Sequence, residues 1–170
     1  MLQESEKMFT IIDKLVAKVT IGFAVIGATL IGLLALLIVT DVVGRNFGFP
    51  VVGIVELAAQ TVVISAFLTI PFVMRRGSHI RATVIISRLP EAWRKGFEVL
   101  AYAVGVTIFA LLAYSSFGNF MTDYLAASYE GEGALRVPTW PARLTIFLAS
   151  MLMVVEGLLS IIKTFIGEKK

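Results

Sequence analysis

Four ionisable residues stand inside or beside long apolar stretches of the chain and are the first candidates for chemistry: Asp41, Arg45, Glu56 and Glu156. Asp41 and Arg45 are spaced i, i+4 with the acid first, the order that favours an ion pair on a helix. Glu56 falls in the first turn of an apolar stretch, where the positive end of the helix dipole stabilises a carboxylate. We expect these residues either to form structural ion pairs or to contact a partner protein.

Of these four residues, Glu156 has the greatest need of a partner that compensates its charge. It lies seven residues before Lys163, which separates the two by about 10 Å along a helix. A charge at that depth in a membrane is costly unless it is paired or solvated. We therefore expect a cationic partner, either Lys18 at the start of the first apolar stretch or a group on another subunit. Without such a partner, Glu156 is expected to be protonated.

Enzymatic chemistry has little support in the sequence. There is no cysteine and a single histidine, His79, so thiol nucleophiles, thiolate metal sites and haem held by two histidines are excluded. No phosphate-binding glycine loop, metalloprotease motif or nucleophile constellation occurs. The basic segment after residue 74 has no aromatic or motif support for nucleic-acid binding. We predict that the chain is not an enzyme and has no catalytic residue, cofactor or metal of its own.

The composition of the chain indicates that membrane-spanning helices position these ionisable residues. Of the 170 residues, 58% are hydrophobic and 16% are charged, and the mean hydropathy is +0.89, whereas soluble domains have about a quarter charged residues. Apolar runs long enough to cross about 30 Å of hydrocarbon predict four transmembrane helices, at about residues 19–43, 51–74, 95–122 and 141–163. We predict an all-α membrane protein in which residues 1–170 form one four-helix domain.

The basic residues are distributed unevenly between the two sides of these spans. With four spans both termini lie on one side, and that side has twelve of the 15 lysines and arginines. The other side has only Arg45, Arg136 and Arg143, together with acidic residues after the third span. Because loops rich in lysine and arginine stay in the cytoplasm during insertion, we predict that both termini are cytoplasmic.

The segment between the second and third spans has the features of a helix that lies in the headgroup layer. Gly77 and Ser78 suit the end of one helix and the start of another, and Pro90 suits the end of the second. The apolar residues between them share one face, which predicts an amphipathic interfacial helix at about residues 78–89. The basic and aromatic residues expected to anchor this region at the membrane interface are Arg75, Arg76, Arg81, Arg88, Trp93, Arg94 and Lys95.

A set of short motifs occurs in one order along the chain. Asp41-Val42-Val43-Gly44-Arg45 ends the first span, Pro50 follows, and Glu56-Leu57-Ala58 opens the second span. Arg75-Arg76-Gly77-Ser78-His79-Ile80-Arg81 follows the second span, and Val137-Pro138-Thr139-Trp140-Pro141 precedes the fourth. In these motifs, its length and its four spans, the chain resembles the small membrane subunit, or Q subunit, of tripartite ATP-independent periplasmic (TRAP) transporters.

The resemblance implies a sodium-coupled transport system of three parts for organic acids, in the inner membrane of a bacterium or an archaeon. A periplasmic binding protein captures the acid, a large membrane subunit moves it with sodium ions by an elevator motion, and the small subunit braces the stationary scaffold. This chain would then bind no substrate, and its partners would be the large subunit, the binding protein and membrane lipids. Sodium ions would bind in the large subunit. Together with Asp41 and Arg45, the residues expected to help dock the binding protein are Asp123, Glu130, Glu132 and Arg136.

Two other functions remain open on the residues alone. A small homo-oligomeric proton-coupled exporter would use an intramembrane carboxylate, Glu56 or Glu156, to bind proton and cation in turn. Against it, Glu56 lies near a helix end, and the loop after the second span is long and basic. The other alternative is a structural accessory subunit of another membrane complex, such as a respiratory enzyme. The single histidine argues only against haem-carrying versions of such a subunit.

Overall fold

The computed structural model describes residues 2–76, 91–131 and 136–166. Four long helices make up most of this part of the chain: α1 (Leu2–Asn46), α2 (Ile54–Arg75), α4 (Glu91–Leu125) and α5 (Trp140–Ile166). Each contains a stretch long and apolar enough to cross a membrane. This confirms the predicted all-α membrane fold with four spans. The interfacial helix predicted at about residues 78–89, with Arg81 and Arg88, lies outside the described residues.

Sequence features explain where the helices begin and end. α1 begins at Leu2, before the span predicted from about residue 19, because no glycine or proline interrupts the residues before the first apolar run. Gly48, with a positive φ of 81°, and Pro50 follow the end of α1. Two short strands, β1 (Tyr129–Glu130) and β2 (Val137–Pro138), pair antiparallel between α4 and α5. This hairpin is a small addition to the predicted all-helical fold.

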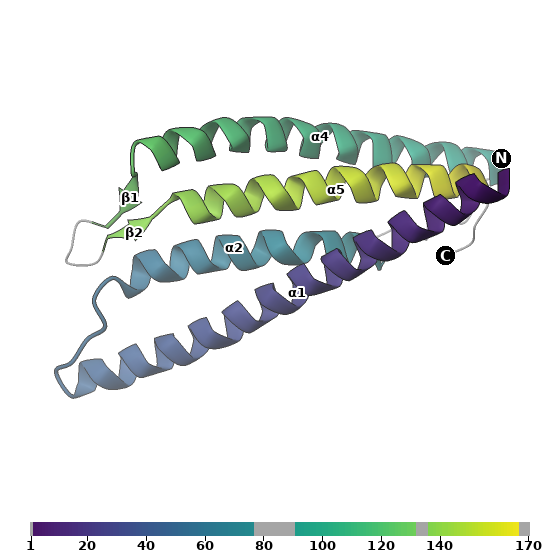
Figure 1. Ribbon diagram of the computed structural model, residues 1–170. Coiled ribbons are helices and arrows are strands. Elements are labelled where there is room, and N and C mark those ends of the chain that lie inside the picture. The colour runs from purple at the N-terminus through teal and green to yellow at the C-terminus, as the bar shows by residue number, and fades with distance from the viewer. Residues whose placement is uncertain (1, 77–90, 132–135, 167–170) are drawn as a thin grey trace.

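The helices form an open row in the order α4, α5, α2, α1 (Figure 1). α5 packs along α4 on one side and along α2 on the other, while α1 packs mainly on α2. α1 and α4 are therefore the edge helices of the row. The start of α1 and the ends of α2 and α5 lie together at what we call the terminal end. The α1–α2 loop and the β1–β2 pair lie at the opposite end, which we call the hairpin end.

Two glycines allow neighbouring helices to approach closely. A Cβ on Gly27 of α1 would lie 3.0 Å from the carbonyl oxygen of Ser65 and 3.0 Å from Thr69 Cγ2, both in α2. A Cβ on Gly157 of α5 would lie 2.5 Å from Val106 Cγ2 of α4. Small residues at such crossings let membrane helices pack where hydrophobic burial supplies no driving force. Close contact at these two positions therefore helps to fix the order of the row.

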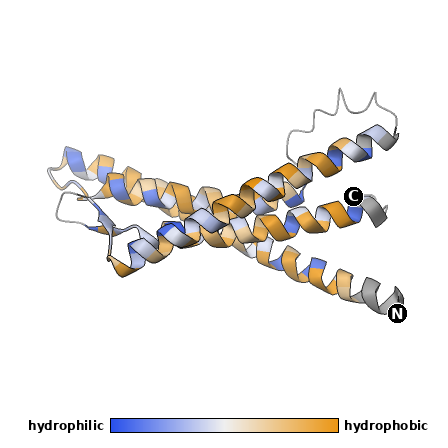
Figure 2. Ribbon diagram, turned by 90° about the horizontal axis from the view of Figure 1, so that it is seen from above, coloured by the Kyte–Doolittle hydropathy of each residue, from blue (hydrophilic) through white to orange (hydrophobic). Residues whose placement is uncertain are grey.

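Hydrophobic residues make up most of the length of the four helices (Figure 2), and many of their large apolar side chains are exposed. In the most apolar stretches of α1 and α4, 11% and 6% of the residues are buried within the chain, against 33% in that of α5. Contiguous exposed apolar surface of this extent is not compatible with water. Lipid or another membrane protein must therefore cover the two edge helices.

Candidate functional site

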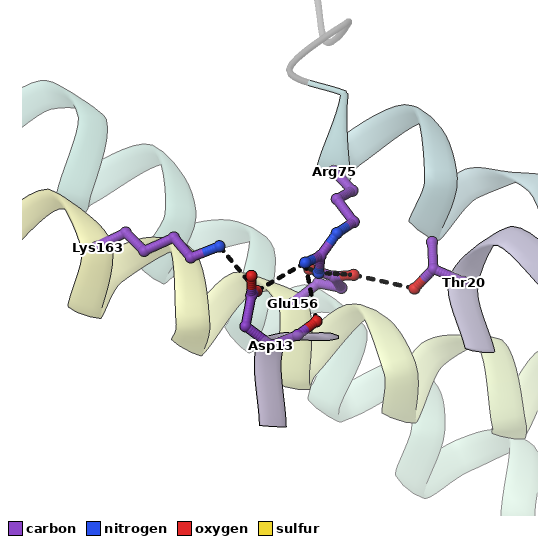
Figure 3. Close-up of polar contacts among 5 residues, drawn as sticks. All are labelled: Asp13, Thr20, Arg75, Glu156 and Lys163. Atoms are coloured by element: carbon purple, nitrogen blue, oxygen red, sulfur yellow. Dashed lines mark hydrogen bonds and ion pairs between the residues drawn. The ribbon is translucent and has the colours of Figure 1, made fainter. Parts of the chain in front are cut away.

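A cluster of charged side chains joins three helices at the terminal end of the row (Figure 3). Asp13 comes from α1, Arg75 from the last turn of α2, and Glu156 and Lys163 from α5. Thr20 of α1 completes this group, which we call the charge cluster. Asp13 and Thr20 are seven residues apart, and so are Glu156 and Lys163, which places each pair on one face of its helix.

Arg75 is the centre of the charge cluster. Its Nη1 donates to both carboxylate oxygens of Glu156, at 2.8 and 2.9 Å. Its Nη2 donates to the Asp13 carboxylate at 2.7 Å and to the Asp13 carbonyl oxygen at 2.9 Å. A planar guanidinium suits this geometry because its donors are held in fixed directions. One side chain thus ties α2 to α5 through one nitrogen and to α1 through the other.

The other two members complete the hydrogen bonding of the carboxylates. Lys163 Nζ lies 2.7 Å from Asp13 Oδ1, and Thr20 Oγ1 donates to Glu156 Oε1 at 2.9 Å. Glu156 is only 3% exposed, whereas Asp13, Arg75 and Lys163 are partly exposed. The two carboxylates and the two cations balance in charge. The charge cluster therefore adds no net charge to a weakly solvated region.

This geometry suits structural support better than the binding of a solute. Glu156 accepts three hydrogen bonds, two from Arg75 and one from Thr20. A cation or a proton at Glu156 would have to compete with the guanidinium for the same oxygens. Breaking a buried ion pair by loss of one partner is strongly destabilising. The charge cluster therefore fixes α1, α2 and α5 relative to one another at the terminal end.

The partner of Glu156 corrects one sequence-based expectation. Arg75, expected only as an interfacial anchor, pairs with Glu156, whereas Lys18 is exposed. Lys18 has a suitable depth along α1, but residues two positions apart point to nearly opposite sides of a helix. Thr20, which contacts Glu156, occupies the side that faces α5. The expected cationic partner of Glu156 is therefore present as Arg75, but the direction of the Lys18 side chain around its helix did not follow from the sequence argument.

Sequence reasoning did not identify Asp13 and Lys163 as members of a site. Lys163 enters the sequence argument only as a basic residue of the cytoplasmic side and as the reference point for the depth of Glu156, and Asp13 does not enter it. The seven-residue spacings from Asp13 to Thr20 and from Glu156 to Lys163 are the available signal. Such spacing places polar side chains two turns apart on one face of a helix.

Asp41 and Arg45 lie together at the hairpin end. Arg45 Nε is 2.7 Å from Asp41 Oδ2, and the backbone N–H of Val51 donates to Asp41 Oδ1 at 2.8 Å. Asp41 is buried, while more than half of the Arg45 side chain is exposed. The carboxylate thus fastens the α1–α2 loop to the end of α1. Glu56 is partly exposed in the first turn of α2 and forms no ion pair with a described residue.

Asp123, expected to belong to a docking surface, is largely engaged within the chain. Its Oδ2 accepts a hydrogen bond from Thr139 Oγ1 at 2.8 Å and lies 3.5 Å from Arg143 Nε. Its carbonyl oxygen accepts from the backbone N–H of Ser128 at 2.9 Å. Asp123 therefore links the end of α4 to the start of α5.

Two other candidate docking residues remain accessible at the hairpin end. Glu130 is exposed, and its Oε2 accepts a hydrogen bond from Gln60 Nε2 at 2.8 Å. Arg136 is exposed and lies over the ring of Tyr129, 4.5 Å from the ring centre. Glu132 lies outside the described residues. The hairpin end therefore presents charges of both signs, each supported by a neighbouring side chain.

The candidate interfacial anchors lie near the terminal end. Arg76 is exposed and its guanidinium lies 4.7 Å from the centre of the Phe72 ring. Trp93 and Lys95 are exposed near the start of α4. The side chain of Arg94 lies outside the described part of the structure. Exposed aromatic and basic residues at a helix end are typical of a membrane interface.

Four helices long and apolar enough to cross a membrane, joined by ion pairs toward the two ends of the row, define a multi-pass helical membrane protein. Among the residues that the structure describes, no group of three or more histidine, aspartate or glutamate side chains is placed to hold a metal ion. The chain matches, over residues 34–167, the family described as "Tripartite ATP-independent periplasmic transporters, DctQ component". It therefore belongs to the DctQ family, the small membrane subunit of TRAP transporters.

This membership confirms the resemblance inferred from the motifs of the sequence. The family consists of transporter subunits, so the chain is not an enzyme. A search among curated proteins gave no match to the chain.

Proposed function

We propose that this chain is the scaffold subunit of a sodium-coupled TRAP transporter for organic acids in the inner membrane of a prokaryote. It braces the large elevator-type subunit and helps to dock the periplasmic binding protein. In this proposal the terminal end of the row faces the cytoplasm and the hairpin end faces the periplasm, in agreement with the distribution of lysine and arginine. Family membership and the charge cluster support the proposal.

The charge cluster is the observation that carries the bracing role. An elevator mechanism needs a stationary part that keeps its place in the bilayer while another part moves. Three helices tied through one arginine resist sliding and tilting relative to one another, because such motion separates Arg75 from the buried Glu156 carboxylate and from the partly exposed Asp13. An open row also presents two long edge faces, to which a larger neighbour can bind. These properties suit a support.

The organic acid and the sodium ions belong, in this proposal, to the large subunit. The hydroxyls of Thr29, Thr40 and Thr61 donate to carbonyl oxygens of their own helices, so they are not directed at a common centre. A site for a carboxylate needs several converging polar groups in a pocket. We therefore assign no cofactor, metal ion or solute to this chain.

The exposed charges at the hairpin end are the proposed contribution to docking. The Arg45 side chain is held by Asp41 yet more than half exposed, and Glu130 and Arg136 are exposed. Asp123 contributes indirectly, because it joins α4 to α5 beneath this surface. Complementary charges between such a surface and a soluble partner mainly accelerate and orient association.

A proton-coupled exporter is less compatible with the contacts of Glu156. Such a carrier would need this carboxylate to exchange a proton and a cation in turn, but Arg75 contacts both of its oxygens. Glu56 lies in the first turn of α2, at the hairpin end rather than near the middle of the span. No contact in the described residues favours this second function.

Sodium-gradient uptake in proteoliposomes tests the proposed function. Vesicles that contain the large subunit, this chain and the binding protein are compared with vesicles that lack this chain, across a panel of organic acids. We expect sodium-driven uptake that depends on this chain, and none from vesicles that contain this chain alone. Matched incorporation of the large subunit is the control. Equal uptake without this chain, or transport by this chain alone, would contradict the proposal.

A further inference from the structure

The exposed face of α4 has polar side chains that lipid cannot satisfy. Tyr114, Ser115 and Asn119 are exposed on this face, and Tyr114 is 84% exposed. Their side chains form no hydrogen bond with any residue that the structure describes. Gly118 lies between them, and a Cβ at this glycine would meet nothing within 4 Å. The face therefore combines unused donors and acceptors with room for close approach.

Tyr114 and Ser115 lie within the span, whereas Asn119 lies about one turn from its charged end. Asp123 is the next charged residue along α4, about 6 Å beyond Asn119 and about 14 Å beyond Tyr114 along the helix axis. Side chains on a helix tilt toward its N-terminus, which for α4 is the terminal end. The phenol of Tyr114 is therefore directed further into the span and away from the headgroups near Asp123. It cannot reach that interface as a side chain near a helix end can.

The exposed hydroxyls of α1, at the opposite edge of the row, already have hydrogen-bond acceptors within the chain. The exposed hydroxyls of Thr29 and Thr40 in α1 donate to the carbonyl oxygens of Val25 and Leu36, at 2.8 and 2.9 Å. A Cβ at Gly32 of α1 would also meet nothing within 4 Å. The large exposed side chains around this glycine are apolar. Lipid tails can cover this face of α1 without leaving a polar group unsatisfied.

We propose that the exposed face of α4 is the intramembrane interface with the large subunit, whose facing helix supplies hydrogen-bonding groups to Tyr114, Ser115 and Asn119. The α1 edge of the row faces lipid instead. This inference rests on the proposed function, in which a large membrane subunit is the partner of the chain. In hydrocarbon an unpaired polar group is costly, and only another protein helix can pair with it along the span.

The same face continues toward the terminal end as an apolar surface. Ile108 and Leu111 are exposed on it. Beyond them lies a shallow apolar hollow with a volume of about 360 Å³, lined by Trp93, Gly96, Phe97 and Leu100. One long helix of the large subunit can therefore place polar side chains against the outer third of α4 and apolar side chains against the rest.

Bulky substitutions at two open glycines test the inference. Gly118→Trp on α4 and Gly32→Trp on α1 both enter open space, so the fold of the chain should tolerate either. Each tagged variant is co-expressed with the large subunit and purified in mild detergent. We expect recovery of the large subunit to fall about tenfold or more with Gly118→Trp, and to stay within about twofold of wild type with Gly32→Trp.

A second measurement does not depend on the fold tolerating a tryptophan. The photoreactive residue p-benzoylphenylalanine replaces Tyr114 in one sample and Leu36 of α1 in another, and illumination should join only the first to the large subunit. Recovery that is unchanged by Gly118→Trp, or lowered equally by both tryptophans, would overturn the inference. Cross-linking from position 114 to a second copy of this chain would also overturn it. Failure of the wild-type chain to recover the large subunit would refute the proposed function itself.

Discussion

Arg75→Met probes the charge cluster most sharply, because one substitution removes the contacts that join three helices. Methionine keeps much of the length and volume of the side chain but loses the four hydrogen bonds to Glu156 and Asp13. Asp13 retains Lys163 as a partner. Glu156 retains only the hydroxyl of Thr20. The expected damage is therefore concentrated on the buried carboxylate of Glu156.

The size of the effect follows from burial. Loss of one partner from a buried ion pair costs about 3–5 kcal/mol. Glu156 is almost fully buried but the Arg75 side chain is 20% exposed, so we expect the lower end of that range, about 3 kcal/mol in the free energy of unfolding. This corresponds to roughly a hundredfold change in the unfolding equilibrium constant. Arg76→Met is the matched control, since the neighbouring Arg76 is exposed and contacts the Phe72 ring.

Equilibrium unfolding in mixed micelles, with far-UV circular dichroism recorded as the fraction of dodecyl sulfate rises, measures these free energies. The double variant Arg75→Met, Glu156→Met should regain most of the lost stability, because an apolar pair of similar volume often replaces a buried ion pair at little cost. The reasoning is refuted if Arg75→Met destabilises the chain no more than Arg76→Met. It is also refuted if the double variant is less stable than Arg75→Met alone.

Three further predictions concern other parts of the row. Asp41→Asn replaces the carboxylate that accepts the hydrogen bond of the Val51 backbone N–H with a weaker acceptor, so this amide hydrogen should exchange with deuterium roughly tenfold faster. An unchanged exchange rate would show that Asp41 does not fasten the α1–α2 loop. Gly27→Leu should destabilise the chain by about 2 kcal/mol in the micelle assay, because the crossing of α1 with α2 has no space for a side chain. The control Gly32→Leu should change the free energy of unfolding by less than about 0.5 kcal/mol. Equal effects of the two substitutions would argue against a tight crossing at Gly27. Glu130→Lys should slow association with the binding protein in low salt and have less effect in high salt; identical association rates by biolayer interferometry would remove Glu130 from the docking surface.

The four spans could be predicted from the sequence because the membrane leaves few choices. An apolar run of sufficient length in lipid must satisfy its backbone internally and so becomes a helix. α1 begins at Leu2, before the span predicted from about residue 19, since hydropathy marks where a span enters lipid and does not mark where a helix begins. The helix continues until a residue such as Gly48 or Pro50 opposes it.

The site was predictable only in part, for a geometric reason. The depth of Glu156 in an apolar run requires a partner, and depth can be counted along the sequence. The identity of that partner depends on which helices are neighbours and on how each is rotated about its axis. Arg75 reaches Glu156 across 81 positions of the sequence, because α2 packs beside α5. That order depends on close packing at positions such as Gly27, which hydropathy does not report.

Sodium binding provides the most direct test of whether this chain is framework rather than carrier. Purified chain in nanodiscs, the complex with the large subunit and empty nanodiscs are compared by equilibrium binding of radioactive sodium. A supporting role predicts saturable sodium binding by the complex and none above the empty nanodiscs for this chain alone. Saturable binding by the isolated chain that Glu156→Gln abolishes would contradict it.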